Sequence, residues 1–146
     1  MFRFRLESVL KVRERMARIR QKEFSEVMAR QQALDAQILT HQESLARASE
    51  FTNQARRGNG TVFTLEMFNH FQRRLKGEID LLAEQKREEA QELEAKRKTL
   101  VEAKRAQKTL EILRDKEKQR YEQEMNRRER LTMDEVARNY FLLNSR

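Results

Sequence analysis

Few residues of this chain have the types and spacing that catalysis or metal binding requires. The two histidines, His41 and His70, lie far apart without further ligand-type residues at close spacing, so a zinc site is not expected. Cysteine is absent, which excludes disulfides, thiolate ligands and sulfur nucleophiles. The tetrapeptide GNGT (residues 58–61) lacks the lysine and the glycine spacing of a phosphate-binding loop and is typical of a turn. We therefore expect no enzymatic activity, no cofactor and no small-molecule substrate.

Positive charge is the strongest chemical signal, and it is concentrated near the N-terminus. Residues 1–22 contain eight Lys and Arg against two Glu, whereas the net charge of the whole chain is +8. Such a field attracts nucleic acid, anionic lipid or an acidic protein surface. Nucleic acid is disfavoured, because acidic residues are interleaved almost everywhere downstream and no helix-turn-helix, RRM or KH motif is visible. A lipid-surface helix is disfavoured because the charges of the first segment are not confined to one face.

The composition indicates long helices rather than a compact domain. Proline is absent, glycine occurs three times and charged residues make up 38% of the chain. The mean hydropathy of −0.98 leaves too few apolar residues to fill a spherical core. No apolar run approaches the roughly 18 residues of a membrane span. The N-terminus lacks the apolar centre of a secretory signal, and Glu7 and Glu14 interrupt the pattern of a mitochondrial presequence.

Apolar residues recur at alternating steps of three and four, as in a helix that packs against one partner helix. The first series is Phe24, Val27, Gln31, Leu34, Ile38, His41, Leu45, Ala48. The second series is Leu65, Phe68, Gln72, Leu75, Ile79, Leu82, Lys86, Glu89, Leu93, Lys96, Leu100, Ala103, Gln107, Leu110. The polar members of both series weaken the seam, so we expect a marginal, flexible coiled coil. A single break, RRGNGTVFT, separates the two series and predicts an all-α fold, a two-helix antiparallel coiled-coil hairpin with unequal arms and an overhanging second helix.

We expect a first helix over residues 1–57, a turn over residues 58–63 and a second helix over residues 64–146. Gly58 suits a helix C-terminal cap with positive φ, and Thr61 or Thr64 can cap the second helix. A hairpin centred on Asn59 leaves residues 117–146 without an intramolecular partner, as a single-helix or frayed extension. The segment TMDE (residues 132–135) has the capping-box pattern, at which this helix could break and restart.

Two regions carry more apolar residues than a two-helix seam needs. Val9, Val12, Met16 and Ile19 form a second stripe on the first helix, which predicts self-association or a third covering element. Near the turn, Phe63 and Met67 also exceed the seam. Exposed aromatics at a hairpin tip would suit a binding surface, and the alternative is that they close the end of the coil.

The start FRFRLESVLKVRE (residues 2–14) and the segment DEVARNYF (residues 134–141) resemble the flagellar export protein family FliJ. The resemblance covers nearly the whole chain, and its most specific part is the alternation of Phe with a basic residue followed by Leu-Glu-x-Val-Leu-x-x-Arg. It implies a non-enzymatic coiled coil of the bacterial flagellar type III export apparatus, similar in shape to the central stalk of rotary ATP synthases. Related injectisome stalk proteins remain an alternative, as does a basic coiled coil that binds nucleic acid or a membrane surface.

The resemblance also implies three partners, namely the hexameric export ATPase, a membrane protein of the export gate, and export chaperones. It implies a cytoplasmic location, peripheral to the inner membrane through the export apparatus. We expect residues 1–22 and 117–146 to contact the ATPase ring. The candidate ring-contacting residues are Phe2, Arg3, Phe4, Arg5, Leu6, Val9, Leu10, Arg13, Tyr121, Tyr140, Phe141.

For the export gate, the family's contacting segment follows the hairpin turn and carries an aromatic residue with a Leu four residues on. Phe71 and Leu75 match this pattern, and they are the candidate gate-contacting residues. One turn further on, Glu78 and Leu82 depart from the small and histidine residues of the family, so no role is carried over to them.

Overall fold

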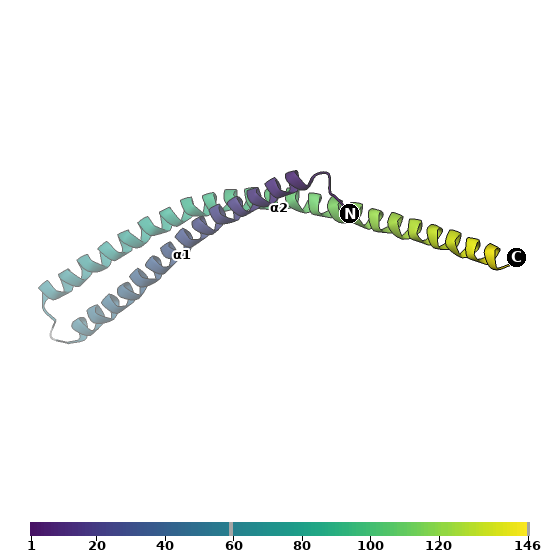
Figure 1. Ribbon diagram of the computed structural model, residues 1–146. Coiled ribbons are helices and arrows are strands. Elements are labelled where there is room, and N and C mark those ends of the chain that lie inside the picture. The colour runs from purple at the N-terminus through teal and green to yellow at the C-terminus, as the bar shows by residue number, and fades with distance from the viewer. Residues whose placement is uncertain (59, 146) are drawn as a thin grey trace. The chain divides into compact units, whose positions relative to one another are not determined.

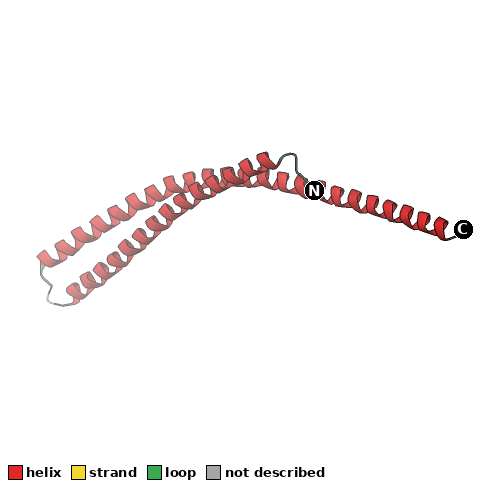
Figure 2. Ribbon diagram, viewed as in Figure 1, coloured by secondary structure: helices red, strands yellow, loops and turns green. Residues whose placement is uncertain are grey.

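The structure is a computed structural model that describes residues 1–58 and 60–145. It contains two helices, α1 (Glu7–Arg57) of 51 residues and α2 (Val62–Asn144) of 83 residues (Figures 1 and 2). The described residues contain no strand, and the predicted all-α hairpin is confirmed. The chain divides into two units, Ile19–Leu100 and Met1–Arg18 with Val101–Arg146.

The unit Ile19–Leu100 is an antiparallel hairpin in which α1 and α2 lie side by side (Figure 1). Every predicted seam residue of this unit is buried or half-buried, which confirms the seam. The most buried are Val27, Ala48 and Leu75. Most of the others are only half-buried, because a two-helix layer covers a single stripe of each helix.

The turn is built differently from the prediction. Gly58 does not form a left-handed cap, because no described glycine has a positive φ. Its N–H donates to the Gln54 carbonyl over 2.9 Å, so Gly58 continues the helical pattern instead. The close approach is at Gly60, where a Cβ atom would lie 2.5 Å from the Ala55 carbonyl oxygen. The predicted centre, Asn59, lies outside the described residues.

Thr61 caps α2, as predicted. Its hydroxyl accepts a hydrogen bond from the Thr64 N–H over 3.3 Å, and α2 begins at the next residue, Val62. A free N–H at the helix start thus gains a partner, which is the usual role of a threonine at this position. α2 therefore begins two residues before the predicted start at Thr64, which lies inside the helix.

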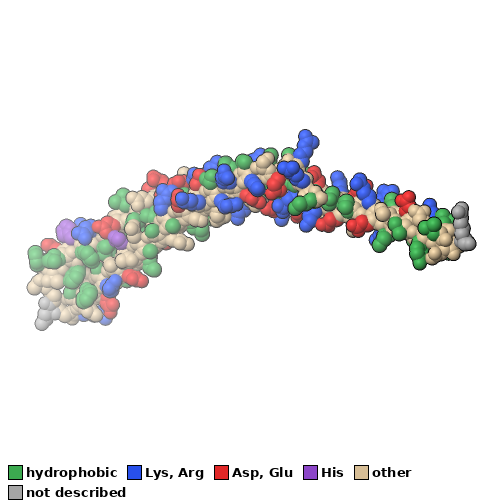
Figure 3. Space-filling view, in the orientation of Figure 1, with side chains coloured by type: hydrophobic (Ala, Val, Ile, Leu, Met, Phe, Trp, Pro, Cys, Tyr) green, Lys and Arg blue, Asp and Glu red, His purple; other side chains and the backbone are tan. Residues whose placement is uncertain are grey.

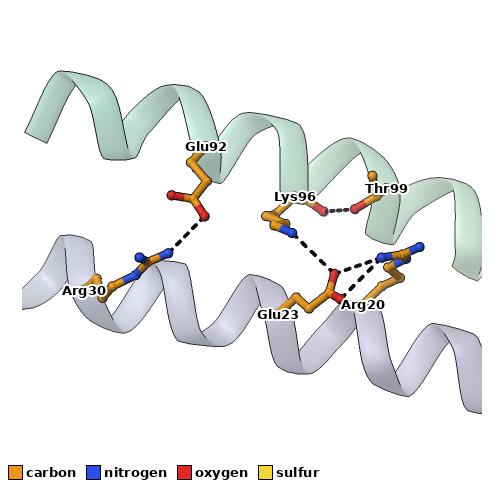
Figure 4. Close-up of polar contacts among 6 residues, drawn as sticks. All are labelled: Arg20, Glu23, Arg30, Glu92, Lys96 and Thr99. Carbon is orange, nitrogen blue, oxygen red and sulfur yellow. Dashed lines mark hydrogen bonds and ion pairs between the residues drawn. The ribbon is translucent and has the colours of Figure 1, made fainter.

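Charged side chains bridge the two helices where the seam is polar (Figure 4). Arg30 donates to Glu92 over 3.0 Å and lies 3.7 Å from Glu89. The predicted centre at Asn59 places residue 88 opposite Arg30, so the observed partners lie one and four residues further along α2. Lys86 pairs with Asp35 over 2.6 Å, and Lys96 with Glu23 over 3.6 Å. Exposed pairs of this kind contribute little free energy, but polar seam positions select one register over others.

Neighbouring cations perturb the carboxylate of Glu23. Arg20 donates two hydrogen bonds to its carboxylate, over 3.0 and 3.3 Å, and this contact lowers the pKa of Glu23 most (Figure 4). Lys96 on α2 lowers that pKa further by its positive charge. The ionised carboxylate is therefore the form that the folded hairpin favours.

The second unit pairs the start of the chain with residues 101–121 of α2. Leu10 is completely buried there, and Phe4 and Ala17 are nearly so. The predicted seam residues Ala103, Gln107 and Leu110 are half-buried, as expected. The same rhythm continues through half-buried residues at positions 114, 117 and 121.

The first helix begins at Glu7 rather than at residue 1. Residues 2–5 are not helical, and their burial alternates, with Phe2 and Phe4 covered and Arg3 and Arg5 exposed. Successive side chains of an extended chain point to opposite sides, so this alternation of Phe and Arg places the rings inward and the guanidinium groups outward.

Beyond Tyr121, α2 continues as a single helix whose described residues, 122–145, are all exposed; we call this segment the C-terminal extension. The positions that would continue the seam are mostly charged, namely Glu124, Arg128, Glu135 and Arg138. A charged stripe cannot pack against an apolar partner helix, which explains why the pairing stops here. The predicted restart at Thr132 is wrong, because this hydroxyl donates to the Arg128 carbonyl within an unbroken helix.

Candidate protein-binding surfaces

The histidines and acidic residues that the structure describes do not gather into a metal centre. The described part of the chain holds no group of three His, Cys, Asp or Glu side chains that could bind a metal ion. His70 is exposed, whereas His41 is a half-buried seam residue whose Nε2 lies 2.9 Å from Glu78. Within residues 1–58 and 60–145 no helix is long and apolar enough to span a membrane. The exposed charged and apolar side chains of the two units are candidate surfaces for contact with other proteins.

The N-terminal segment packs onto α2 through aromatic side chains. The ring of Phe2 lies 5.7 Å from the ring of Tyr121, with the two planes inclined by 48°. Tilted aromatic pairs at this separation are favourable because the positive edge of one ring approaches the negative face of the other. Two predicted ring-contacting residues that are far apart in sequence are thus brought together.

A hollow of about 700 Å³ lies beside this aromatic pair, and we call it the basic groove. It is lined by Phe2, Arg3, Phe4, Arg5, Glu7, Ser8, Lys11, Arg114, Lys118. Five of these side chains are cationic and one is acidic. Arg114 and Lys118 have acidic neighbours on α2, but Arg3, Arg5 and Lys11 form no ion pair with any described residue. The basic groove therefore attracts carboxylates.

The candidate ring-contacting residues on α1 and before it differ in burial. Leu10 and Phe4 lie in the core of their own unit and are not available to a partner. Phe2 and Leu6 are half-buried. The remaining candidates on α1 and before it, Arg3, Arg5, Val9 and Arg13, are exposed.

Tyr140 and Phe141 are exposed on the C-terminal extension. They follow Tyr121 by about twenty residues, or roughly 30 Å of helix, so the structure does not bring them to the basic groove. Any partner that contacts both must be extended along α2.

The second apolar stripe of α1 is exposed. Val9, Val12, Met16 and Ile19 have between 39% and 57% of their surface accessible. No described element covers them, so self-association and a covering partner both remain consistent with this stripe.

Near the turn, hydrophobic side chains gather on the surface of the unit Ile19–Leu100 (Figure 3). We call residues 51–57 and 62–75 the tip. Phe63 and Met67 are strongly exposed, so they do not close the end of the coil. Of the two candidate gate-contacting residues, Phe71 is 41% exposed, whereas Leu75 is only 5% exposed and belongs to the seam. Of these two candidates, only Phe71 has a side chain that a partner can reach.

Phe51 is a surface residue that the sequence reasoning missed. Its ring stacks on that of Phe68, with centroids 6.2 Å apart and planes only 2° from parallel, yet it remains 58% exposed. The missed signal is the continuation of the first seam series by one step to Thr52, which is buried and accepts a hydrogen bond from Gln72 over 3.1 Å. Phe51 directly precedes this seam position, so it lies at the edge of the seam.

Comparison with known proteins agrees with the family resemblance of the sequence. The family of flagellar FliJ proteins matches residues 1–146. No curated protein and no solved structure matches the chain significantly. Because the family match extends over the whole sequence, the chain belongs to the FliJ family and is a component of the flagellar export apparatus.

Proposed function

We propose that this chain is a non-enzymatic stalk component that links the hexameric export ATPase to the membrane export gate. The ATPase would bind the unit that contains the basic groove and the C-terminal extension. The gate would bind the tip. Export chaperones are further partners, and the chain acts in the cytoplasm, peripheral to the inner membrane through these contacts.

The observation that carries the ATPase contact is the exposure of the C-terminal extension. Its eight large apolar side chains are between 37% and 77% exposed: Met125, Leu131, Met133, Val136, Tyr140, Phe141, Leu142, Leu143. Apolar side chains at this density on an isolated helix favour a partner that removes them from water. The cations of the basic groove favour a partner with an acidic lining.

Truncation after Tyr121 tests the ATPase contact. Deleting residues 122–146 keeps the Phe2–Tyr121 pair and the seam, so the remaining coil should fold, as circular dichroism would verify. We expect binding to the assembled ATPase ring and stimulation of its ATP hydrolysis to be lost. A matched control deletes only Ser145 and Arg146. Undiminished binding and stimulation by the long truncation would contradict the proposal.

Separate substitutions test the gate contact. Phe71→Ala should weaken binding to the gate protein and reduce motility without a change in the melting temperature, because Phe71 is exposed. Leu75→Ala should lower the melting temperature instead, because Leu75 is a seam residue. If the double variant binds the gate and supports motility at wild-type levels, the tip does not contact the gate.

The alternative of a basic coiled coil for nucleic acid or anionic membranes has a direct test. We expect no binding of duplex DNA, RNA or anionic vesicles at physiological salt. Tight binding that falls steeply with salt would favour the alternative, because displaced counterions make phosphate binding salt-dependent.

A further inference from the structure

The tip presents aromatic side chains from both helices, and their relative placement follows from the register. Arg30 and Glu92 each directly precede a seam residue, Gln31 on α1 and Leu93 on α2, and they meet at 3.0 Å. In an antiparallel coil, the residues that precede facing seam positions lie on the same side of the seam. The Arg30–Glu92 pair identifies that side for the whole hairpin unit.

Phe51 and Phe71 occupy the equivalent positions closer to the turn. Phe51 follows Arg30 by three heptads, and Phe71 precedes Glu92 by three heptads. The residues that follow them, Thr52 and Gln72, are hydrogen-bonded to each other across the seam. Phe51 and Phe71 therefore flank the same side of the coil, and the ring of Phe68 stacks on Phe51 between the two helices.

Two arginines flank this aromatic side. The guanidinium of Arg74 lies 5.9 Å from the centre of the Phe71 ring, and its Nε also pairs with Glu78 over 3.4 Å. Arg47 lies four residues before Phe51 on α1, and residues four apart share a helix face. Arg47 donates only to the backbone carbonyl of Glu43, over 3.4 Å, and forms no ion pair among the described side chains. Residues 44–78 hold six Lys and Arg against three Glu, so the surroundings are basic as well.

We infer that Phe51, Phe68 and Phe71 form one aromatic docking surface, shared by both helices, for an apolar protein segment flanked by carboxylates. The apolar part of the segment covers the rings, and its carboxylates reach Arg47 and Arg74. The inference rests on the proposed gate function, and it assigns the occupant to the export gate protein. The gate contact then includes α1 as well as α2, and the exposed Phe51, rather than the buried Leu75, is the second contact residue beside Phe71.

Binding of the detergent-solubilised gate protein to the full-length chain tests this surface. We expect Phe51→Ala and Phe71→Ala each to weaken binding about tenfold or more, as for aromatic residues at the centre of an interface. Leu39→Ala, which removes a 55% exposed apolar side chain about 18 Å along α1, should change binding less than twofold. Phe51→Leu should recover part of the affinity, because it restores an apolar side chain.

Charge is tested in the same assay. Arg47→Gln should weaken binding and reduce its salt dependence, whereas Arg87→Gln, at an exposed position outside the tip, should do neither. Because the chain has no native cysteine, a photocrosslinker can be attached to a single cysteine at position 39 or at position 54, an exposed position one helical turn from Phe51. Position 54 should give the crosslink to the gate protein, and position 39 should not.

The possible outcomes separate the inference from the proposed function. If the wild-type chain does not bind the gate protein, the gate function itself fails. If Phe71→Ala weakens binding but Phe51→Ala behaves like Leu39→Ala, the gate contact stands and the shared surface is overturned. If Phe51→Ala instead abolishes self-association measured by sedimentation, the occupant is a second copy of the chain and the assignment to the gate is wrong.

Discussion

The ring of Phe2 lies 5.7 Å from that of Tyr121, and Tyr121 is the last half-buried residue of α2 before the exposed C-terminal extension. The contact holds a non-helical segment, residues 2–5, against α2. It also marks where the paired part of α2 ends and the C-terminal extension begins.

Removing this contact should release the N-terminal segment without unfolding the coil. We expect Tyr121→Ala to cost at least about 0.5–1.5 kcal/mol, the contribution of an aromatic pair beyond the area that it buries. Hydrogen exchange of residues 2–10 should accelerate, while exchange in the unit Ile19–Leu100 should not. Tyr140→Ala is the matched control, since Tyr140 is exposed. Equal exchange in the two variants would show that the ring contact does not hold the segment.

Leu10 should be the most sensitive apolar position of its unit, because it is completely buried. Leu10→Ala should lower the free energy of unfolding by about 2–5 kcal/mol, from lost transfer energy and a residual cavity. Val12→Ala, at an exposed position two residues on, should change it by less than about 0.5 kcal/mol. Urea unfolding followed by circular dichroism measures both. Similar effects of the two substitutions would contradict the packing.

Glu89 should be a destabilising seam residue. Its Oε2 atom is buried and has no hydrogen-bond partner among the described residues, and Oε1 lies 3.7 Å from Arg30. Glu89→Leu should raise the free energy of unfolding by about 1 kcal/mol, because an unpaired polar atom is removed and Arg30 keeps Glu92. Glu89→Gln, which keeps a polar group there, should gain less. A lower stability of Glu89→Leu would show that the carboxylate is satisfied.

Glu23 should make the free energy of unfolding depend on pH in the acidic range. Because contact with Arg20, and then with Lys96, lowers its pKa below the ordinary 4.5, the unfolded chain binds this proton more readily than the folded one. The stabilisation is therefore present above pH 4.5 and is lost as pH falls through the lowered pKa. The difference in unfolding free energy between wild type and Glu23→Gln should shrink on acidification below that pH. Glu26→Gln is the control, and a difference that does not change with pH would exclude this linkage.

Replacement by alanine should change the stability of the protein in opposite directions at Gly60 and Gly77. A Cβ atom at Gly77 would meet nothing within 4 Å, so Gly77→Ala should stabilise α2 by about 1 kcal/mol. A Cβ atom at Gly60 would lie 2.5 Å from the Ala55 carbonyl oxygen, so Gly60→Ala should destabilise the hairpin. Melting temperatures of the two variants should move apart. A loss of stability at Gly77 would indicate a close helix approach there.

The sequence predicted most of the seam because helical periodicity is local. All predicted seam residues, including polar ones such as His41 and Lys86, are buried or half-buried. The cap at Thr61 was predictable for the same reason, since it depends on neighbours three residues away. The start of α1 was not, because Phe2 packs against Tyr121 of α2, which is distant in the sequence.

The sequence by itself determined two long helices, their apolar stripes and the position of the single turn, since each depends on residues within a few positions of one another. Only the tertiary structure decided which side chains beside the seam meet. It buried Leu75, left Phe51 and Phe71 exposed on one side, and paired Phe2 with Tyr121. These contacts join residues up to 119 positions apart, and they depend on the register between the helices, which long-range ion pairs and seam packing set.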